Sequence, residues 1–371
     1  MAKDIYDNRI ENLQDLMYKN NLDYLGVIAG KDLKYLTGMD FHLSERPVIL
    51  IVRKDGEPIL IYPGFEHEKA NSCSIEFQKF SYGEDADSLH YACHSALKLF
   101  DEGKKGIGVS PQSMRFLEMN LLVQADPGIR LVSAEESFKE IYIQKSAEEI
   151  EKIRRAVKIA EEAMRATLPY LRAGISERKI ANKLVIHLLE EGSDPDLPFS
   201  PIVASGPNSA NPHAVPGSRK LQQGDLVIID WGARAEGYVS DITRTYCLGN
   251  VDGDLHKAYD VVMQANLNAR KEVKPGILAS SIDQAARETI EKAGMGEFFT
   301  HRTGHGIGLE AHEHPYISQT STVELKSGMV FTIEPGIYLP GRGGIRIEDN
   351  VFVTDTDSNT LTSLPLELQI L

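Results

Sequence analysis

The most informative pattern in the chain lies between residues 301 and 349. It reads in three parts: His301-Arg302-Thr303-Gly304-His305-Gly306-Ile307-Gly308-Leu309-Glu310-Ala311-His312-Glu313-His314-Pro315, then Phe331-Thr332-Ile333-Glu334-Pro335-Gly336, then Gly344-Ile345-Arg346-Ile347-Glu348-Asp349. Four of the chain's 11 histidines fall in the first part. Glycines lie on both sides of His305, so the backbone there can pack closely or take a positive φ. Glu334 and Glu348 each end a short run rich in β-branched residues, where a strand would hold an acid rigidly. A histidine-rich loop followed by a surface hairpin is the simpler alternative for this stretch.

An earlier stretch of the chain has the same layout. A glycine, an apolar strand, an acid at its end, a hairpin and a second acid occur at Gly224, residues 226–229, Asp230 and Asp241. The same order returns at Gly328, residues 330–333, Glu334 and Glu348. A pair of predicted helices precedes each copy. This pattern predicts a diverged internal duplication whose pseudo-twofold arrangement brings the four acids together.

Four carboxylates and one histidine facing one another predict a metal site. Like charges at such distances are unfavourable, and two divalent cations would offset four carboxylates. Oxygen ligands with a single imidazole suit Mn²⁺ or Co²⁺, and Zn²⁺ and Fe²⁺ remain possible. Two metal ions close together lower the pKa of a shared water and hold the oxygen that develops charge. The predicted chemistry is therefore hydrolysis.

The composition narrows the function classes. A chain of 371 residues predicts two domains. The net charge of -14 argues against a nucleic-acid partner, which requires a basic surface. Cys73, Cys93 and Cys247 are widely spaced and odd in number, which predicts reduced thiols and a cytoplasmic protein. No apolar run approaches 18 residues and the first residues lack an apolar core, so we expect neither a membrane span nor a signal peptide.

The first part of the chain reads as an α/β domain without chemistry of its own. Helices are predicted at about residues 8–20, 87–101 and 112–124, with strands at 24–29, 47–52, 58–62 and 106–109. Ser146 and Glu149 have the spacing of a capping box and begin a long helix. We therefore predict domains at 1–135 and 136–371. Residues 193–218 read as a long loop, which in a compact domain is usually functional.

The set Asp230, Asp241, His305, Glu334 and Glu348 resembles the metal ligands of the pita-bread metallopeptidases. The Xaa-Pro peptidases, aminopeptidase P and prolidase, are the most similar members. Residues 334–338 and 343–349 match signatures of that family, and the first 135 or so residues resemble its creatinase-type N-terminal domain. The resemblance implies an α/β N-terminal domain and an α+β pita-bread C-terminal domain with a pseudo-twofold internal repeat.

The resemblance also implies roles for individual residues. Asp230 would be the bidentate ligand of one metal, Asp241 and Glu348 would bridge both, and His305 and Glu334 would complete the other. Glu334 would also take a proton from the attacking water. The further residues that match the family, as catalytic or substrate-binding groups, are His213, His301, His312, Arg346 and Tyr338. Each of these residues also has a purely structural alternative. The three histidines could be ordinary loop or core residues, Arg346 could form a simple ion pair, and Tyr338 could serve packing. His314 matches no family position and is expected to be a solvated loop residue.

The implied activity is hydrolysis of the peptide bond before proline, in small proline-containing peptides and by a homodimer. A strict dipeptidase must read a free carboxylate one residue beyond that bond, which an arginine does well. Some prolidases carry an arginine four residues after the histidine that His312 resembles, and here that position is Tyr316. Arg342 is a candidate substitute in a glycine-flanked turn. The sequence therefore favours an Xaa-Pro aminopeptidase, with an Xaa-Pro dipeptidase as the alternative.

Three other members of the fold agree less well with the residues. A methionine aminopeptidase would lack the N-terminal domain, and a creatinase works without these metal ligands. A non-catalytic peptide-binding module would have lost the metal ligands, whereas all five are present in this sequence.

Overall fold

The computed structural model describes residues 5–371, which divide into two compact units between Ile141 and Tyr142. The boundary lies beyond the expected residue 135 because helix α6 (Glu135–Ile143) begins there and belongs largely to the first unit. Within that unit, Asn20 Nδ2 donates to Ser137 Oγ at 2.8 Å and the Tyr35 hydroxyl donates to the Ile141 carbonyl at 3.2 Å.

The first unit is an α/β domain built on one six-stranded sheet. The strand order is β4-β3-β2-β1-β5-β6, in which β1 is antiparallel to β2 and parallel to β5. The strands are β1 (Tyr24–Ile28), β2 (Ile49–Arg53), β3 (Ile59–Pro63), β4 (Gln78–Tyr82), β5 (Gly106–Val109) and β6 (Arg130–Ser133). The helices before α6 are α1 (Ile5–Lys19), α2 (Lys31–Thr37), α3 (His67–Asn71), α4 (Ala86–Leu97) and α5 (Phe116–Ala125).

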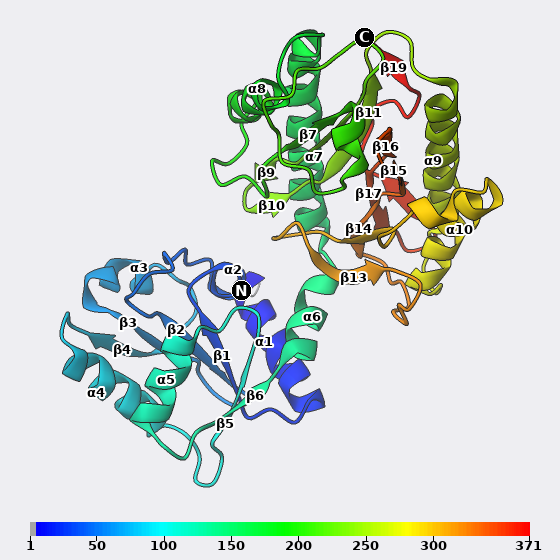
Figure 1. Cartoon of the computed structure of the whole chain (residues 1–371). Coiled ribbons are helices and arrows are strands. Elements are labelled where there is room, and N and C mark those ends of the chain that lie inside the picture. The colour runs from blue at the N-terminus through cyan, green and yellow to red at the C-terminus, as the bar shows by residue number, and fades with distance from the viewer. Residues whose placement is uncertain (1–4) are drawn as a thin grey trace. The chain divides into compact units, whose positions relative to one another are not determined.

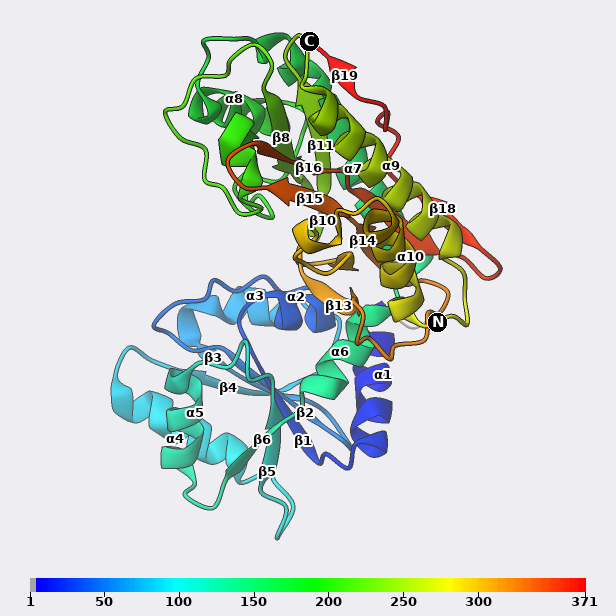
Figure 2. The same ribbon diagram turned by 45° about the vertical axis from the view of Figure 1, so that its right-hand side comes forward.

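Alternation along the strands explains how this sheet is covered. Alternate side chains of a strand point to the same face of the sheet, and on one face Ile49, Ile51 and Ile107 pack with the buried residues of α4 and α5. These two helices lie on the same face of the sheet (Figure 2). Helices α1 and α2 contact β1 and β2 instead.

The second unit consists of two similar halves. In Figure 1 the pair α7 (Ala147–Thr167) and α8 (Glu177–Glu190) flanks the strands on one side, and α9 (Gly253–Glu272) and α10 (Ala279–Lys292) flank them on the other. The first half contains the sheet β19-β11-β8-β7 and the second half the sheet β13-β12-β14-β17-β18. This is the predicted pita-bread architecture with its internal repeat.

The strands of the second unit are short, and most are buried. They are β7 (Ile202–Ser205), β8 (Leu226–Trp231), β9 (Arg234–Ala235), β10 (Tyr238–Val239), β11 (Ile242–Cys247), β12 (Gly304–Gly306), β13 (Glu313–Ile317), β14 (Val330–Ile333), β15 (Gly336–Leu339), β16 (Gly343–Arg346), β17 (Asp349–Val353), β18 (Ser358–Thr360) and β19 (Gln369–Ile370). The two halves join where Thr243 bridges to Glu348, whose N–H donates to the Thr243 carbonyl at 3.0 Å.

Helix α7 begins as its sequence predicts. The Ser146 hydroxyl accepts from the Glu149 N–H at 3.2 Å, and the Glu149 carboxylate accepts from the Ser146 N–H at 2.8 Å. This reciprocal pair satisfies two backbone donors that a helix start otherwise leaves open.

The segment 193–218 differs from the expected continuous loop. Residues Ile202–Ser205 form strand β7, which pairs with β8 so that Ile202 lies opposite Asp230. This short strand lies in a segment rich in Pro, Gly, Ser and Asn, so its sequence alone did not indicate a strand, and it is formed by pairing with β8.

None of the helices in residues 5–371 combines the length and apolar character that a membrane crossing requires.

Candidate active site

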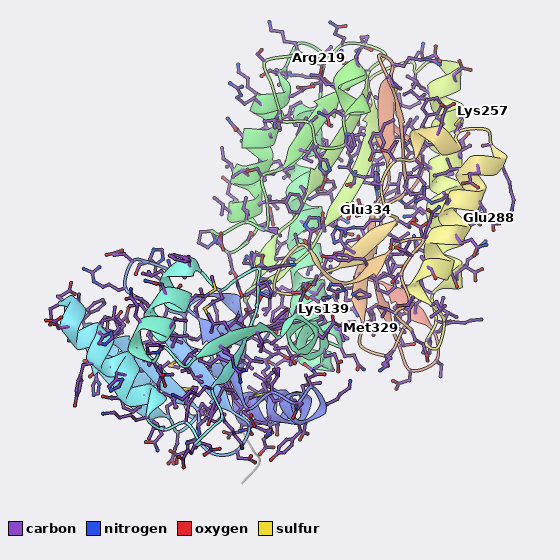
Figure 3. All side chains as sticks on the ribbon, turned by 60° about the horizontal axis from the view of Figure 1, so that its bottom comes forward. Lys139, Arg219, Lys257, Glu288, Met329 and Glu334 are labelled. Carbon is purple, nitrogen blue, oxygen red and sulfur yellow. The ribbon has the colours of Figure 1, made fainter. Side chains whose placement is uncertain are left out.

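A cavity of about 490 Å³ in the second unit contains most of the predicted site residues. Its walls are formed by Phe199, Ser200, Ile202, Pro212, His213, Asp230, Asp241, His301, Arg302, His305, His312, Glu334, Arg346 and Glu348. Figure 3 shows Glu334 in the interior of this unit, between the α7–α8 half and the α9–α10 half. The internal repeat has therefore brought all four predicted acids to one place.

Two of the acids come from the first half of the repeat. Asp230 lies in β8 directly opposite Thr243 of β11, and Asp241 immediately precedes β11. A separate short hairpin, β9–β10, intervenes between them, so the return of the chain is longer than a simple hairpin. Asp241 is fixed from the second half, because its N–H donates to Asn350 Oδ1 at 3.2 Å and its carbonyl accepts from Asn350 Nδ2.

The glycines around His305 have a steric reason. A Cβ at position 304 would lie 1.9 Å from the Thr332 carbonyl oxygen, and one at position 306 would lie 2.2 Å from the His314 carbonyl oxygen. Only glycine lets β12 fit between β13 and β14. The predicted close packing around His305 is therefore present, and the His305 N–H donates to Thr332 Oγ1 at 3.1 Å.

The imidazole of His305 faces two carboxylates. Its Nε2 lies 3.1 Å from Glu334 Oε1 and 3.9 Å from Asp241 Oδ2. Its Nδ1 lies 3.2 Å from the Gly306 carbonyl, which can only accept a hydrogen bond, so Nδ1 carries the proton. In a neutral ring the Nε2 lone pair would then point at anionic oxygens, and a proton or a metal ion must lie between them.

The donor set fits divalent metal ions. Ligand atoms of Asp241, His305 and Glu348 all lie within 4.8 Å of one another. Asp230 Oδ1 is buried and has no hydrogen-bond partner among the described residues. A buried carboxylate oxygen without a partner is unfavourable, and a cation would satisfy it.

The electrostatics agree with this fit. Burial, followed by repulsion from Glu348, Asp230 and Glu334, raises the pKa of Asp241 well above its usual range. Burial and the charges of Glu334 and Asp230 likewise raise the pKa of Glu348 well above its usual range. The ionised forms of these carboxylates therefore need positive charge that the protein itself supplies only in part.

Glu334 behaves differently from its neighbours. Burial alone would raise the pKa of this carboxyl, but the hydrogen bond and charge of His305, together with His301 and Arg346, lower it to about 2. When His305 ligates a metal it is neutral, and the metal charge then takes over this stabilisation. Glu334 is therefore ionised whether or not a metal ion is bound.

Arg346 organises one wall of the cavity. Its guanidinium donates to Asp230 Oδ2 at 2.6 Å, to the Tyr338 hydroxyl at 2.9 Å and, through Nε, to Thr243 Oγ1 at 3.1 Å. The Thr243 hydroxyl donates to Glu348 Oε2 at 2.7 Å. Arg346 thus supports acids from both halves of the repeat.

Tyr338 and His301 continue this network away from Arg346. Tyr338 is buried and its oxygen lies 2.9 Å from His301 Nε2, while His301 Nδ1 donates to the Arg302 carbonyl at 2.7 Å. Burial lowers the pKa of His301, so the ring is neutral with its proton on Nδ1. Both ring nitrogens are therefore bonded within the protein. Tyr338 is not itself part of the cavity wall, but its hydroxyl bonds two wall residues, His301 and Arg346.

His312 and His213 lie at the more open part of the cavity. The His312 ring is 4.1 Å from the His305 ring, centroid to centroid, and His312 as a residue is exposed. Its partial burial, followed by the positive charges of His305 and Arg302, lowers the pKa of His312 to about 4. A neutral His312 can donate one N–H toward the cavity. His213 is exposed, and its backbone N–H donates to Asn211 Oδ1 at 3.0 Å.

Sequence reasoning missed five residues of the wall, which are Phe199, Ser200, Ile202, Pro212 and Arg302. Phe199 and Ile202 supply apolar surface from the segment already expected to be functional, and Arg302 supplies a positive charge. The signal for Arg302 was its place between His301 and His305. His314, expected to be a solvated loop residue, instead lies half-buried in strand β13, and it is not among the wall residues.

A buried cluster of carboxylates and one imidazole, held on a twofold-repeated α+β domain, is the arrangement expected of the pita-bread metallopeptidases. The comparisons with known proteins name the family. Residues 151–355 match the model of metallopeptidase family M24, and residues 9–141 match the creatinase/prolidase N-terminal domain. The chain belongs to metallopeptidase family M24.

Solved structures of relatives agree along the whole chain. A dipeptidase from Pyrococcus horikoshii OT3 is 39% identical with a TM-score of 0.92, covering 98% of this chain and 100% of that one. A prolidase from Thermococcus sibiricus is 35% identical with a TM-score of 0.90, covering 100% of both chains. An X-Pro aminopeptidase from Thermotoga maritima MSB8 is 30% identical with a TM-score of 0.83, covering 98% of this chain and 99% of that one.

Proposed function

We propose that this protein is an Xaa-Pro dipeptidase that uses two divalent metal ions, Mn²⁺ or Co²⁺ in the first instance. The ligands are Asp230, Asp241, His305, Glu334 and Glu348. The single observation that carries the metal site is His305 Nε2 facing Glu334 and Asp241 at 3.1 and 3.9 Å. The dipeptidase activity is supported by the similarity to the Pyrococcus dipeptidase and the Thermococcus prolidase, which exceeds the similarity to the Thermotoga aminopeptidase.

Tyr316 alone favoured an Xaa-Pro aminopeptidase, whereas the dipeptidase is now the better supported activity. The absence of an arginine at one position argued for an aminopeptidase, but the similarity of the whole chain to dipeptidases outweighs a single position. An aminopeptidase that accepts Xaa-Pro-Yaa remains the second candidate, and Tyr316 is the observation that favours it. A non-catalytic module is not supported, because all five ligands line one cavity.

The chain's own residues divide the chemistry among them. Two bound divalent cations would polarise the scissile carbonyl and lower the pKa of the attacking water. The ionised Glu334 carboxylate accepts the proton of that water. His312 donates its N–H to the oxygen that becomes negative, an oxyanion-hole role. Arg346 holds Asp230 and, through Thr243, Glu348 in position, so that the acids do not rearrange during turnover.

The apolar part of the wall suits the substrate. The bond before proline has a tertiary amide without an N–H, so a site for it needs no acceptor for that group. Phe199, Ile202 and Pro212 give the cavity apolar surface that a pyrrolidine ring can contact. His213, at the exposed part, is available to a peptide end.

The test compares two substrates that differ by one residue. We expect kcat/KM for Ala-Pro to exceed that for Ala-Pro-Ala by more than about tenfold, which is roughly 1.4 kcal/mol of transition-state discrimination. The measurement is repeated with Mn²⁺, Co²⁺, Zn²⁺ and Fe²⁺ after removal of bound metal. A preference for Ala-Pro-Ala would make the protein an aminopeptidase, and hydrolysis that is unaffected by metal removal would refute the metal site.

A further inference from the structure

Arg302 occupies a defined place at the edge of the catalytic cavity. It follows His301 and lies two residues before strand β12, and its side chain forms part of the cavity wall. The Thr303 N–H donates to the Ile317 carbonyl at 2.9 Å, and His305 lies opposite Tyr316 in the β12–β13 ladder. From this position the Arg302 side chain reaches the Tyr316 ring. The guanidinium carbon lies 4.2 Å from the centre of the Tyr316 ring, a distance typical of cation–π stacking.

Apart from its stack on Tyr316, the Arg302 guanidinium has no bonded partner among the described residues, whether by an ion pair or by a hydrogen bond. Two other arginines of this unit, Arg346 and Arg342, are both engaged. Arg346 pairs with Asp230 at 2.6 Å, and Arg342 pairs with Asp252 at 2.9 Å and Asp254 at 3.2 Å, outside the cavity wall.

A free guanidinium at this place matters because the cavity is otherwise acidic. Asp230, Asp241, Glu334 and Glu348 would repel a substrate carboxylate. Metal ions offset that charge where the scissile bond lies, but a carboxylate one residue further needs its own cation. The planar fork of an arginine pairs with a carboxylate through two parallel hydrogen bonds. Stacking on Tyr316 restricts the guanidinium, so less freedom is lost when a ligand binds.

We propose that Arg302, supported by the Tyr316 ring, binds the free carboxylate of an Xaa-Pro dipeptide and thereby sets the substrate length. This inference rests on the proposed peptidase function and names the group that recognises the C-terminal end of its substrate. Arg302 is a specificity residue, because it touches the substrate away from the reacting atoms.

The experiment uses the full-length, metal-loaded protein and two substrates that differ only in charge. Ala-Pro carries the carboxylate, and Ala-Pro-amide has the same scissile bond without it. We expect Arg302→Met to raise KM for Ala-Pro by about 10- to 100-fold, the size expected for loss of a charge-assisted hydrogen bond, with little change in kcat. Kinetics with Ala-Pro-amide should stay within about twofold of the wild type.

Three further variants separate the parts of the argument. Arg302→Lys keeps the charge and loses the fork, so its KM for Ala-Pro should fall between those of wild type and Arg302→Met. Tyr316→Phe keeps the ring and should match wild type, whereas Tyr316→Ala should raise KM for Ala-Pro. Arg342→Ala is the matched control, because it removes a surface arginine outside the cavity, and it should leave both substrates unchanged.

The outcomes distinguish this inference from the proposed function. An unchanged KM for Ala-Pro in Arg302→Met, or an equal loss for both substrates, would overturn the role of Arg302 while leaving the dipeptidase intact. A wild-type preference for Ala-Pro-Ala would remove the dipeptidase assignment. A selective loss for Ala-Pro in Arg302→Met would still establish carboxylate binding in that case. Retained turnover of Ala-Pro-amide shows that each variant is folded.

Discussion

Removing one partner of the ion pair between Lys145 and Glu313 should be among the most destabilising single changes in the second unit. Lys145 Nζ lies 2.9 Å from Glu313 Oε2, and the two side chains are only 3% and 6% exposed. The other Glu313 oxygen accepts from the N–H groups of Leu309 at 2.8 Å and Glu310 at 3.1 Å. Glu313 therefore ties the chain before helix α7 to the loop that carries His312.

The magnitude follows from leaving one charge buried alone. Lys145→Met retains the length and apolar stem of the side chain but leaves the Glu313 carboxylate without its cation. Removing one partner of a buried pair costs about 3–5 kcal/mol, because the remaining charge is not hydrated. We therefore expect the free energy of unfolding of the second unit to fall by about that amount.

The double variant Lys145→Met/Glu313→Gln is the control. A glutamine at 313 is neutral, and its amide oxygen can still accept from Leu309 and Glu310. Because replacing a buried pair with neutral groups is often close to neutral, the double variant should recover to within roughly 1–2 kcal/mol of the wild type.

Urea unfolding followed by tryptophan fluorescence measures this directly. The chain has one tryptophan, Trp231, which is fully buried in β8 and reports on the second unit alone. We also expect Lys145→Met to lower kcat for Ala-Pro, since the His312 loop loses its anchor. A cost below about 1 kcal/mol for Lys145→Met, or a double variant less stable than the single one, would refute the argument.

Three further outcomes are expected. His312→Ala should retain its metal content by elemental analysis and lose roughly 10²–10³ in kcat, the usual cost of an oxyanion donor; turnover near wild type would make the residue structural. Chelation should lower the unfolding temperature, and Mn²⁺ should restore it, because a ligand at 100 times its Kd stabilises the native state by about 2.7 kcal/mol; a transition that does not respond to Mn²⁺ would argue against the site. Ser146→Ala should destabilise the second unit by about 1 kcal/mol in urea unfolding, since it removes one half of the α7 capping box, while Ser327→Ala, which removes only a surface hydrogen bond to Asp355, should have little effect.

Local patterns carried much of the prediction. A capping box, an acid after an apolar strand, and glycines around a histidine are features of a few neighbouring residues, so the sequence alone determined where α7 begins and which residues could be ligands. The internal repeat then predicted that Asp230 and Glu348 would meet, although they lie in different halves. The pita-bread fold class was implied by the resemblance to the metallopeptidase family, and the internal repeat was consistent with it.

The contacts of the side chains around those ligands depend on the folded structure. Arg346 bonds Asp230 across 116 positions of the chain, and Lys145 reaches Glu313 across 168. Spacing along the chain carries no information about such contacts, since each depends on how two distant elements pack. The bonding of both His301 nitrogens and the unpaired guanidinium of Arg302 in the cavity wall became visible for the same reason. The sequence named the acids and the histidine, and packing determined which charges around them are neutralised within the protein and which remain for a substrate.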